Sequence, residues 1–229
     1  GADRTLREPL FGRGQCGWAL EQLARNKPRW GGDAILLRMR VKRLLDADRT
    51  AALPEAVESK AAAFAFNEAA PTGIGGEAAF TAFDIYCLWI GLRLLNMGFK
   101  QGEVAAAMRL VRPAIRKAYR SVLNRVPHHD IVFGRPAPKH PDYRAFLWLR
   151  SVDLVGLIRD GAVGHGLRAF SKLAMVFDDF DALTVFLAAE VLNDQDGILL
   201  EVGGAALGLR DLLANAPAIK RGRPVAKDD

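Results

Sequence analysis

The stretch FTAFDIYCLWIGLRLLNMG, residues 80–98, specifies the most sharply defined element of the chain. Thr81 and Asp84 stand three residues apart, as the two partners of a capping box do, which predicts that a helix begins directly after Thr81. Apolar side chains then cover most of the helix circumference, which indicates a helix enclosed by neighbouring elements. Gly98 is the residue type that commonly follows the end of a helix in a left-handed conformation. We therefore expect a buried central helix between Thr81 and Gly98.

The next stretch, FKQGEVAAAMRLVRPAIRKAYRSVLNR at residues 99–125, has the spacing of a helix-turn-helix. Small residues stand where two helices would touch, and Leu110 supplies the apolar side chain at the turn between them. Pro113 suits the first turn of the second helix, because its missing N–H is harmless there. Arg109 stands where a glycine usually holds the turn. We expect a second helix over Arg112–Arg125 with its outer face free to enter a DNA groove.

Basic side chains dominate the outer surface of this predicted unit. Arginine presents a two-pronged donor to phosphate oxygens and guanine edges, and lysine presents a point charge. The residues of this unit that we expect to contact DNA are Arg109, Arg112, Arg116, Lys117, Arg120 and Arg125. The alternative is an ordinary pair of packed helices whose basic face is only solvated.

The charge of the chain is unevenly distributed. The net charge is +6, but residues 93–150 hold 12 basic and 3 acidic side chains and therefore carry +9. The flanking segments are acidic, at −4 for residues 51–92 and −6 for residues 151–215. A strongly basic middle segment favours a polyanionic partner, whose affinity would fall as salt rises.

Three elements are expected before the central helix. Asp33 can cap a basic, amphipathic helix in which apolar residues recur at helical spacing. Pro54 suits the first turn of a further helix that runs through Ala63. Phenylalanine and alanine then alternate before a glycine-rich turn, which predicts a small hairpin over residues 64–80.

Residues 64–111 resemble the later part of the winged-helix domain of MerR-type regulators. The resemblance rests on Phe80, Asp84, the apolar helix, the Gly98-Phe99 turn and a short helix that follows. It implies a winged-helix fold, DNA binding and a role in transcription regulation. In such regulators the recognition helix precedes the wing, which maps here to residues 54–63. That helix and Arg112–Arg125 are alternative groove readers, and the concentration of basic residues favours the downstream one.

A second, smaller domain is expected after a proline-rich linker. Residues 145–152, 183–191 and 198–202 have the pattern of strands, the last two joined as a hairpin through Asp196-Gly197, and a helix follows over residues 205–214. The predicted fold class is α+β, mainly helical. The expected organisation is an irregular segment 1–16, a DNA-binding domain 17–126, a linker 127–141, an α+β dimerisation or sensing domain 142–215 and a basic flexible tail 216–229.

The tail contains RGRP at residues 221–224, which resembles the core of an AT-hook. Glycine keeps such a backbone thin enough for the minor groove, while Arg221 and Arg223 would reach along its floor. The alternative is a disordered basic end. Any contribution of this motif to DNA affinity is expected to be auxiliary.

The remaining polar clusters do not have the spacing of a catalytic or metal site. The histidines of the linker lack the i, i+4 spacing of ligands on a helix, and the aspartates near residue 180 have no phosphate-binding loop beside them. We therefore expect no catalytic residue, metal or cofactor. Two cysteines favour a reducing cytoplasm, and no apolar run reaches the ~20 residues of a membrane-spanning helix.

The sequence thus predicts a double-stranded DNA-binding protein of the cytoplasm, associated with the nucleoid. We interpret it as a transcription regulator that works as a homodimer on paired half-sites. No small-molecule effector can be named. The alternative is a protein-interaction module or a small enzyme whose basic helices contact an acidic partner.

Overall fold

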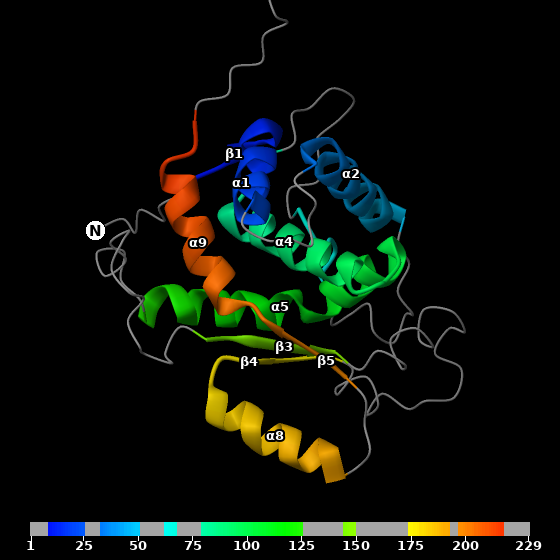
Figure 1. Ribbon diagram of the computed structural model, residues 1–229, viewed down its shortest axis with the longest axis vertical. Coiled ribbons are helices and arrows are strands. Elements are labelled where there is room, and N and C mark those ends of the chain that lie inside the picture. Colours follow the sequence, from blue (N-terminus) through cyan, green and yellow to red (C-terminus); the bar gives the residue numbers. More distant parts are fainter. Residues whose placement is uncertain are drawn as a thin grey trace, which may run out of the picture.

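The computed structural model describes residues 9–25, 33–50, 62–67, 79–125, 144–149, 174–192 and 197–217. Helices make up most of this part, with two small antiparallel sheets (Figure 1), which confirms a mainly helical α+β class. The elements in chain order are β1 (Phe11–Gly12), α1 (Arg13–Arg25), α2 (Ala34–Thr50), β2 (Ala79–Phe80), α4 (Ala82–Asn96), α5 (Gln101–Arg125), β3 (Phe146–Leu149), β4 (Ala174–Phe177), α8 (Phe180–Leu192), β5 (Ile198–Glu201) and α9 (Gly203–Ala214).

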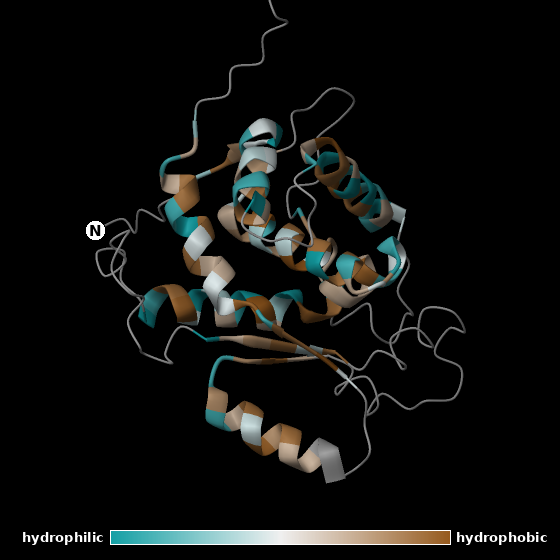
Figure 2. Ribbon diagram, in the orientation of Figure 1, coloured by the Kyte–Doolittle hydropathy of each residue, from teal (hydrophilic) through white to brown (hydrophobic). Residues whose placement is uncertain are grey.

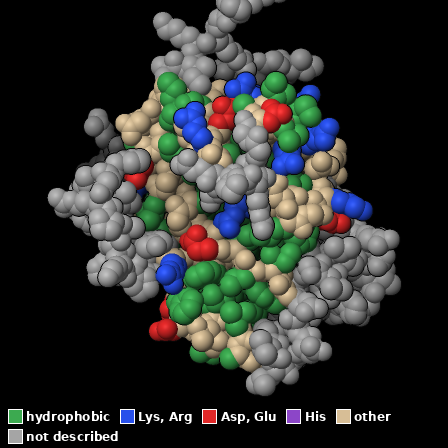
Figure 3. Space-filling view, in the orientation of Figure 1, with side chains coloured by type: hydrophobic (Ala, Val, Ile, Leu, Met, Phe, Trp, Pro, Cys, Tyr) green, Lys and Arg blue, Asp and Glu red, His purple; other side chains and the backbone are tan. Residues whose placement is uncertain are grey.

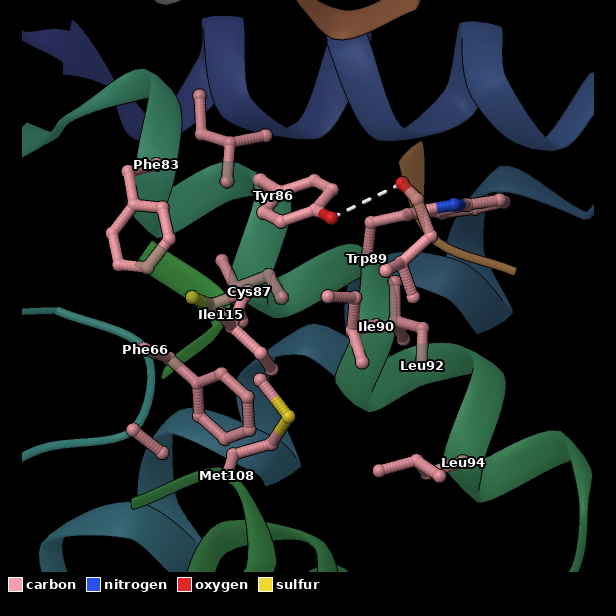
Figure 4. Packing of buried hydrophobic residues seen from close by; sticks show 14 of the residues in the cluster. Phe66, Phe83, Tyr86, Cys87, Trp89, Ile90, Leu92, Leu94, Met108 and Ile115 are labelled. Atoms are coloured by element: carbon pink, nitrogen blue, oxygen red, sulfur yellow. Dashed lines mark hydrogen bonds between the residues drawn. The ribbon is translucent and has the colours of Figure 1, made fainter. Parts of the chain in front are cut away.

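Helix α4 has the start and the end that its sequence predicts. The Thr81 hydroxyl accepts a hydrogen bond from the Asp84 backbone N–H at 3.1 Å, and the Asp84 carboxylate accepts one from the Thr81 backbone N–H at 2.8 Å. Gly98 follows the helix with φ at 99°, a conformation that costs other residue types far more. Side chains of α4 lie at the centre of the core (Figure 4), where the Tyr86 hydroxyl donates to the Val202 carbonyl at 3.1 Å.

Helix α5 lies between two layers (Figure 1). Helices α1, α2, α4 and α9 lie on one side of it, and a sheet of order β4-β3-β5 lies on the other, with α8 across the far face of that sheet. Strand β3 alternates between the two sides, as strand geometry requires. Leu147 and Leu149 belong to the main core, whereas Phe146 and Trp148 form a second cluster with residues of β4 and α8.

The C-terminal elements complete the core of the N-terminal ones. Helix α9 packs against α1, α4 and α5, and a single cluster of buried apolar residues extends from Cys16 to Leu213. The segments 17–126 and 142–215, which we expected to be separate domains, therefore share one hydrophobic core within the part of the chain that is described. Among the described helices, none is both long and apolar enough to cross a lipid bilayer.

The strand predicted over residues 183–191 is wrong, because this stretch lies in α8. Asp179 provides the helix start: its Oδ1 accepts from the Asp181 backbone N–H at 2.9 Å, and its carbonyl accepts from the Leu183 N–H at 3.3 Å. Leucine and alanine, which favour helices, then continue the element. Consequently β5 has no hairpin partner in this stretch and pairs with β3, which also pairs with the unpredicted β4.

The hairpin predicted over residues 64–80 is also not formed as expected. Phe64, Ala65 and Phe66 belong to no strand, and β2 pairs instead with β1, so that Phe80 lies opposite Phe11. The backbone N–H of Ala65 donates to the buried Asp48 carboxylate at 2.8 Å, an interaction with α2 that replaces strand pairing. The predicted helix over residues 54–63 lies outside the described residues except for its last two.

Candidate nucleic-acid interface

Helix α5 is continuous from Gln101 to Arg125, so the turn predicted around Leu110 does not exist. A proline inside a helix removes one N–H and leaves the carbonyl four residues earlier without its helical partner. In this structure the carbonyl of Arg109, four residues before Pro113, accepts from the backbone N–H of Ala62 at 3.0 Å. Ala62 thus provides the hydrogen bond that the Arg109 carbonyl lacks within the helix, and α5 continues through Pro113.

Two of the arginines predicted to contact DNA are buried. Arg109 pairs with Asp48 of α2 through Nε and Oδ1 at 2.9 Å. Arg112 pairs with the Oδ1 of Asp84 on α4 and also donates to the carbonyl of Ala65, and the side chains of Arg112 and Asp84 are each only 2% exposed. The predicted outward position of Arg112 is therefore wrong, and burial removes both arginines from contact with a duplex. Their outward assignment depended on a turn that the helix does not make.

The second half of α5 carries an exposed polar stripe. Pro113, Lys117, Arg120 and Asn124 are all exposed and recur at i, i+4, i+7 and i+11, which places them on one face of the helix. The sequence of α5 contains no carboxylate after Glu103. We call Lys117, Arg120 and Asn124 the α5 stripe. Lys117 and Arg120 have the outward position that the sequence predicts for them.

Two further predicted arginines border the α5 stripe. Arg116 is half-buried, with its guanidinium carbon 4.4 Å from the centre of the Phe83 ring, an arrangement that holds the side chain against the protein. Arg125 is exposed, and its Nη1 donates to the carbonyl of Asp178 at 2.9 Å. Arg125 therefore links the end of α5 to the turn between β4 and α8. Both side chains lie next to the stripe.

The stripe has the chemistry of a nucleic-acid contact. Lysine and arginine bind phosphate oxygens, arginine can form paired hydrogen bonds to guanine, and asparagine can do so to adenine. Asn124 was not among the predicted contact residues. Its spacing from Lys117 and Arg120 on a single uninterrupted helix is the signal that identifies it, and that signal is lost when the helix is divided at Leu110. Arg221 and Arg223 lie outside the described residues.

Among the residues that the structure describes, no group of three or more His, Cys, Asp or Glu side chains is arranged to hold a metal ion. Cys16 and Cys87 are buried and form no disulfide, and burial raises the pKa of the Cys16 thiol to about 12, so it stays protonated at neutral pH. Asp179 serves as the cap of α8.

Comparisons with known protein families, curated proteins and solved structures find no match for this chain.

Proposed function

We propose that this protein binds double-stranded DNA through the α5 stripe and acts as a transcription regulator. The observation that carries the proposal is the run of exposed Lys117, Arg120 and Asn124 on a helix that has no carboxylate after Glu103. The resemblance of residues 64–111 to MerR-type regulators supports the proposal only through the stretch from Thr81 to the start of α5, because the hairpin expected over residues 64–80 is not formed as predicted.

The physical basis of binding is phosphate neutralisation with a smaller contribution from bases. Each phosphate that a lysine or arginine neutralises releases counterions, which makes the negative slope of log K against log salt steeper by about 0.9. Asn124 lies about three helix turns beyond Pro113 on the same face, and its amide is suited to a base edge. Lys117 and Arg120 thus provide affinity for any duplex, whereas Asn124 would discriminate between sequences.

The test measures fluorescence anisotropy of a labelled random-sequence duplex at several salt concentrations. The double substitution Lys117→Ala, Arg120→Ala should weaken binding and make the salt slope less steep by about 2, because two phosphate contacts are lost. The matched control is Arg13→Ala with Arg25→Ala, which removes two exposed cations from the ends of α1. This control should leave the salt slope nearly unchanged.

Two results would overturn the proposal. If the unaltered protein binds no duplex even at low salt, an acidic protein partner becomes the better explanation of the basic helix. Equal losses of affinity for the α5 variant and the α1 control would show that only net charge matters and that the stripe is not a site.

Two further variants separate the roles of the stripe and the tail. Asn124→Ala should leave binding to random duplex unchanged and weaken a selected target sequence by about 1–3 kcal/mol. Removal of residues 218–229 should lower affinity only modestly if the RGRP motif is auxiliary. Loss of all binding on this truncation would move the DNA contact from α5 to the tail.

A further inference from the structure

Two helices carry exposed hydrophobic residues that do not belong to the α5 stripe. On α2, Ile35 is 71% exposed and Met39 is 44% exposed. On α8, Phe180 is 49% exposed and Val185 is 72% exposed. Ile35 and Met39 are one helix turn apart, and large apolar side chains exposed together in this way often mark a surface that contacts another molecule.

The exposed face of α2 is basic as well as apolar. Ile35, Met39 and Lys42 recur at i, i+4 and i+7, and all three are exposed; we call them the α2 row. Arg43 is exposed beside Lys42, whereas Arg38 is paired with Glu21 of α1 at 2.8 Å. Asp46, exposed at i+11 on the same face, is paired with Arg49 at 3.4 Å. Figure 3 shows basic and hydrophobic side chains side by side in the region of α2.

The exposed face of α8 is acidic and apolar. Asp181, Val185 and Ala188 recur at the same i, i+4 and i+7 spacing and are exposed; we call them the α8 row. The sequence of α8 contains no lysine or arginine and is hydrophobic around most of its circumference (Figure 2). In Figure 3 a broad hydrophobic area covers the sheet and α8, with an acidic side chain where α8 begins.

We propose that the α2 row of one copy of this protein docks, antiparallel, on the α8 row of a second copy. In this arrangement Met39 faces Val185, and Lys42 at the end of the α2 row faces Asp181 at the start of the α8 row. The opposite direction would place Lys42 against Ala188 and would leave Asp181 against Ile35. Complementary charge therefore selects the antiparallel direction.

The two rows lie on opposite sides of the molecule. Helix α2 is near the top of Figure 1 and α8 is at the bottom, with α4, α5 and the sheet between them. A two-fold pair through α2 about Met39 would place Lys42 against Ile35, and a two-fold pair through α8 about Val185 would place Asp181 against Ala188. Neither two-fold pair forms the ion pair that the unlike rows form. Docking of unlike surfaces is heterologous and leads to a ring or an open chain of copies, not to the two-fold dimer expected for palindromic half-sites.

The contact is expected to be weak and dependent on concentration. Helix α8 has 13 residues, so about 20 Å of it can lie along α2. A contact confined to one pair of helices lies at the small end of specific interfaces, whose standard size is about 800 Å² per partner. Assembly should therefore grow with protein concentration and decline as salt screens the charged pair.

The first experiment uses Met39→Glu and Val185→Glu in the full chain, measured by sedimentation velocity over a wide range of concentration. The unaltered protein should form species larger than dimers, and each variant alone should stay monomeric. An equal mixture of the two should form dimers and nothing larger, because one intact α2 row meets one intact α8 row. Leu10→Glu, at another exposed apolar residue, is the control and should assemble normally.

Three outcomes would overturn the proposal. The mixture could remain monomeric, either variant alone could still dimerise, or the unaltered protein could be monomeric at every concentration. The antiparallel direction has its own test: Lys42→Glu and Asp181→Lys should each weaken assembly about ten-fold or more, and the two together in one chain should restore it. Circular dichroism verifies that each variant is folded. The α2 row shares no residue with the α5 stripe, so Met39→Glu should leave duplex binding at low protein concentration unaffected.

Discussion

Replacement of Arg112 by methionine separates a structural role of this arginine from a DNA-binding role. The side chains of Arg112 and Asp84 are each 2% exposed and form an ion pair. Removal of one partner leaves a buried charge without its counter-charge, which typically costs about 3–5 kcal/mol of the free energy of unfolding. Lys117→Ala, at an exposed position on the same helix, should change stability by at most about 0.5 kcal/mol.

The assay is urea unfolding of Arg112→Met, Asp84→Asn and the double variant. Asp84→Asn keeps an oxygen that can accept from Thr81, so the cap of α4 is retained in part. The double variant should lose less stability than the sum of the single losses, with a coupling of about 1–3 kcal/mol, because neither buried charge is then left alone.

A different pattern would refute the structural role of Arg112. If Arg112→Met loses less than about 1 kcal/mol of stability and weakens duplex binding as much as Lys117→Ala with Arg120→Ala, then Arg112 is exposed in solution and contacts DNA. If Arg112→Met is less stable but its folded fraction retains duplex affinity, this would confirm that the Arg112–Asp84 ion pair holds α5 to α4.

Three further predictions concern the core. Thr81→Ala removes the cap of α4 and should cost about 0.5–2 kcal/mol in thermal or urea unfolding. Gly91→Ala places a Cβ 2.8 Å from the buried Phe66 ring and should lower the melting temperature, whereas Gly102→Ala, where nothing lies within 4 Å, should raise it; the reverse order would contradict the packing. Because burial raises the pKa of the Cys16 thiol from 9.0 to about 12, the unfolded chain loses this proton first. The free energy of unfolding should therefore fall by up to about 1.4 kcal/mol per pH unit above pH 9, and less steeply in Cys16→Ala.

The elements with strong local signals could be predicted from the sequence. The capping box at Thr81, the glycine at residue 98 and the cap at Asp33, whose Oδ1 accepts from the Ile35 N–H at 2.8 Å, all act within a few residues of themselves. Such interactions form whatever the rest of the fold does. The short strands around Leu147 and Leu200 were also predicted, because their apolar residues are concentrated in short runs.

The errors arose where distant residues decide the structure. Whether Arg112 faces solvent depends on Asp84, which lies 28 residues away, and whether α5 continues through Pro113 depends on the backbone of Ala62. No local pattern reveals these partners. The α8 segment contains residues that favour helices and residues that favour strands, and the cap at Asp179 starts a helix. Asn124 joined the candidate site only once α5 was continuous.

The hydrogen bond from Ala62 to the carbonyl of Arg109 has a consequence for cooperativity. Because Pro113 has no N–H, the carbonyl of Arg109 has no partner within α5, and detachment of Ala62 would remove its hydrogen bond. Opening of the loop and fraying of the helix are thus coupled into a single event. In amide hydrogen exchange, the Ala62 N–H should exchange at the rate of the interior of α5 and not at that of a surface segment.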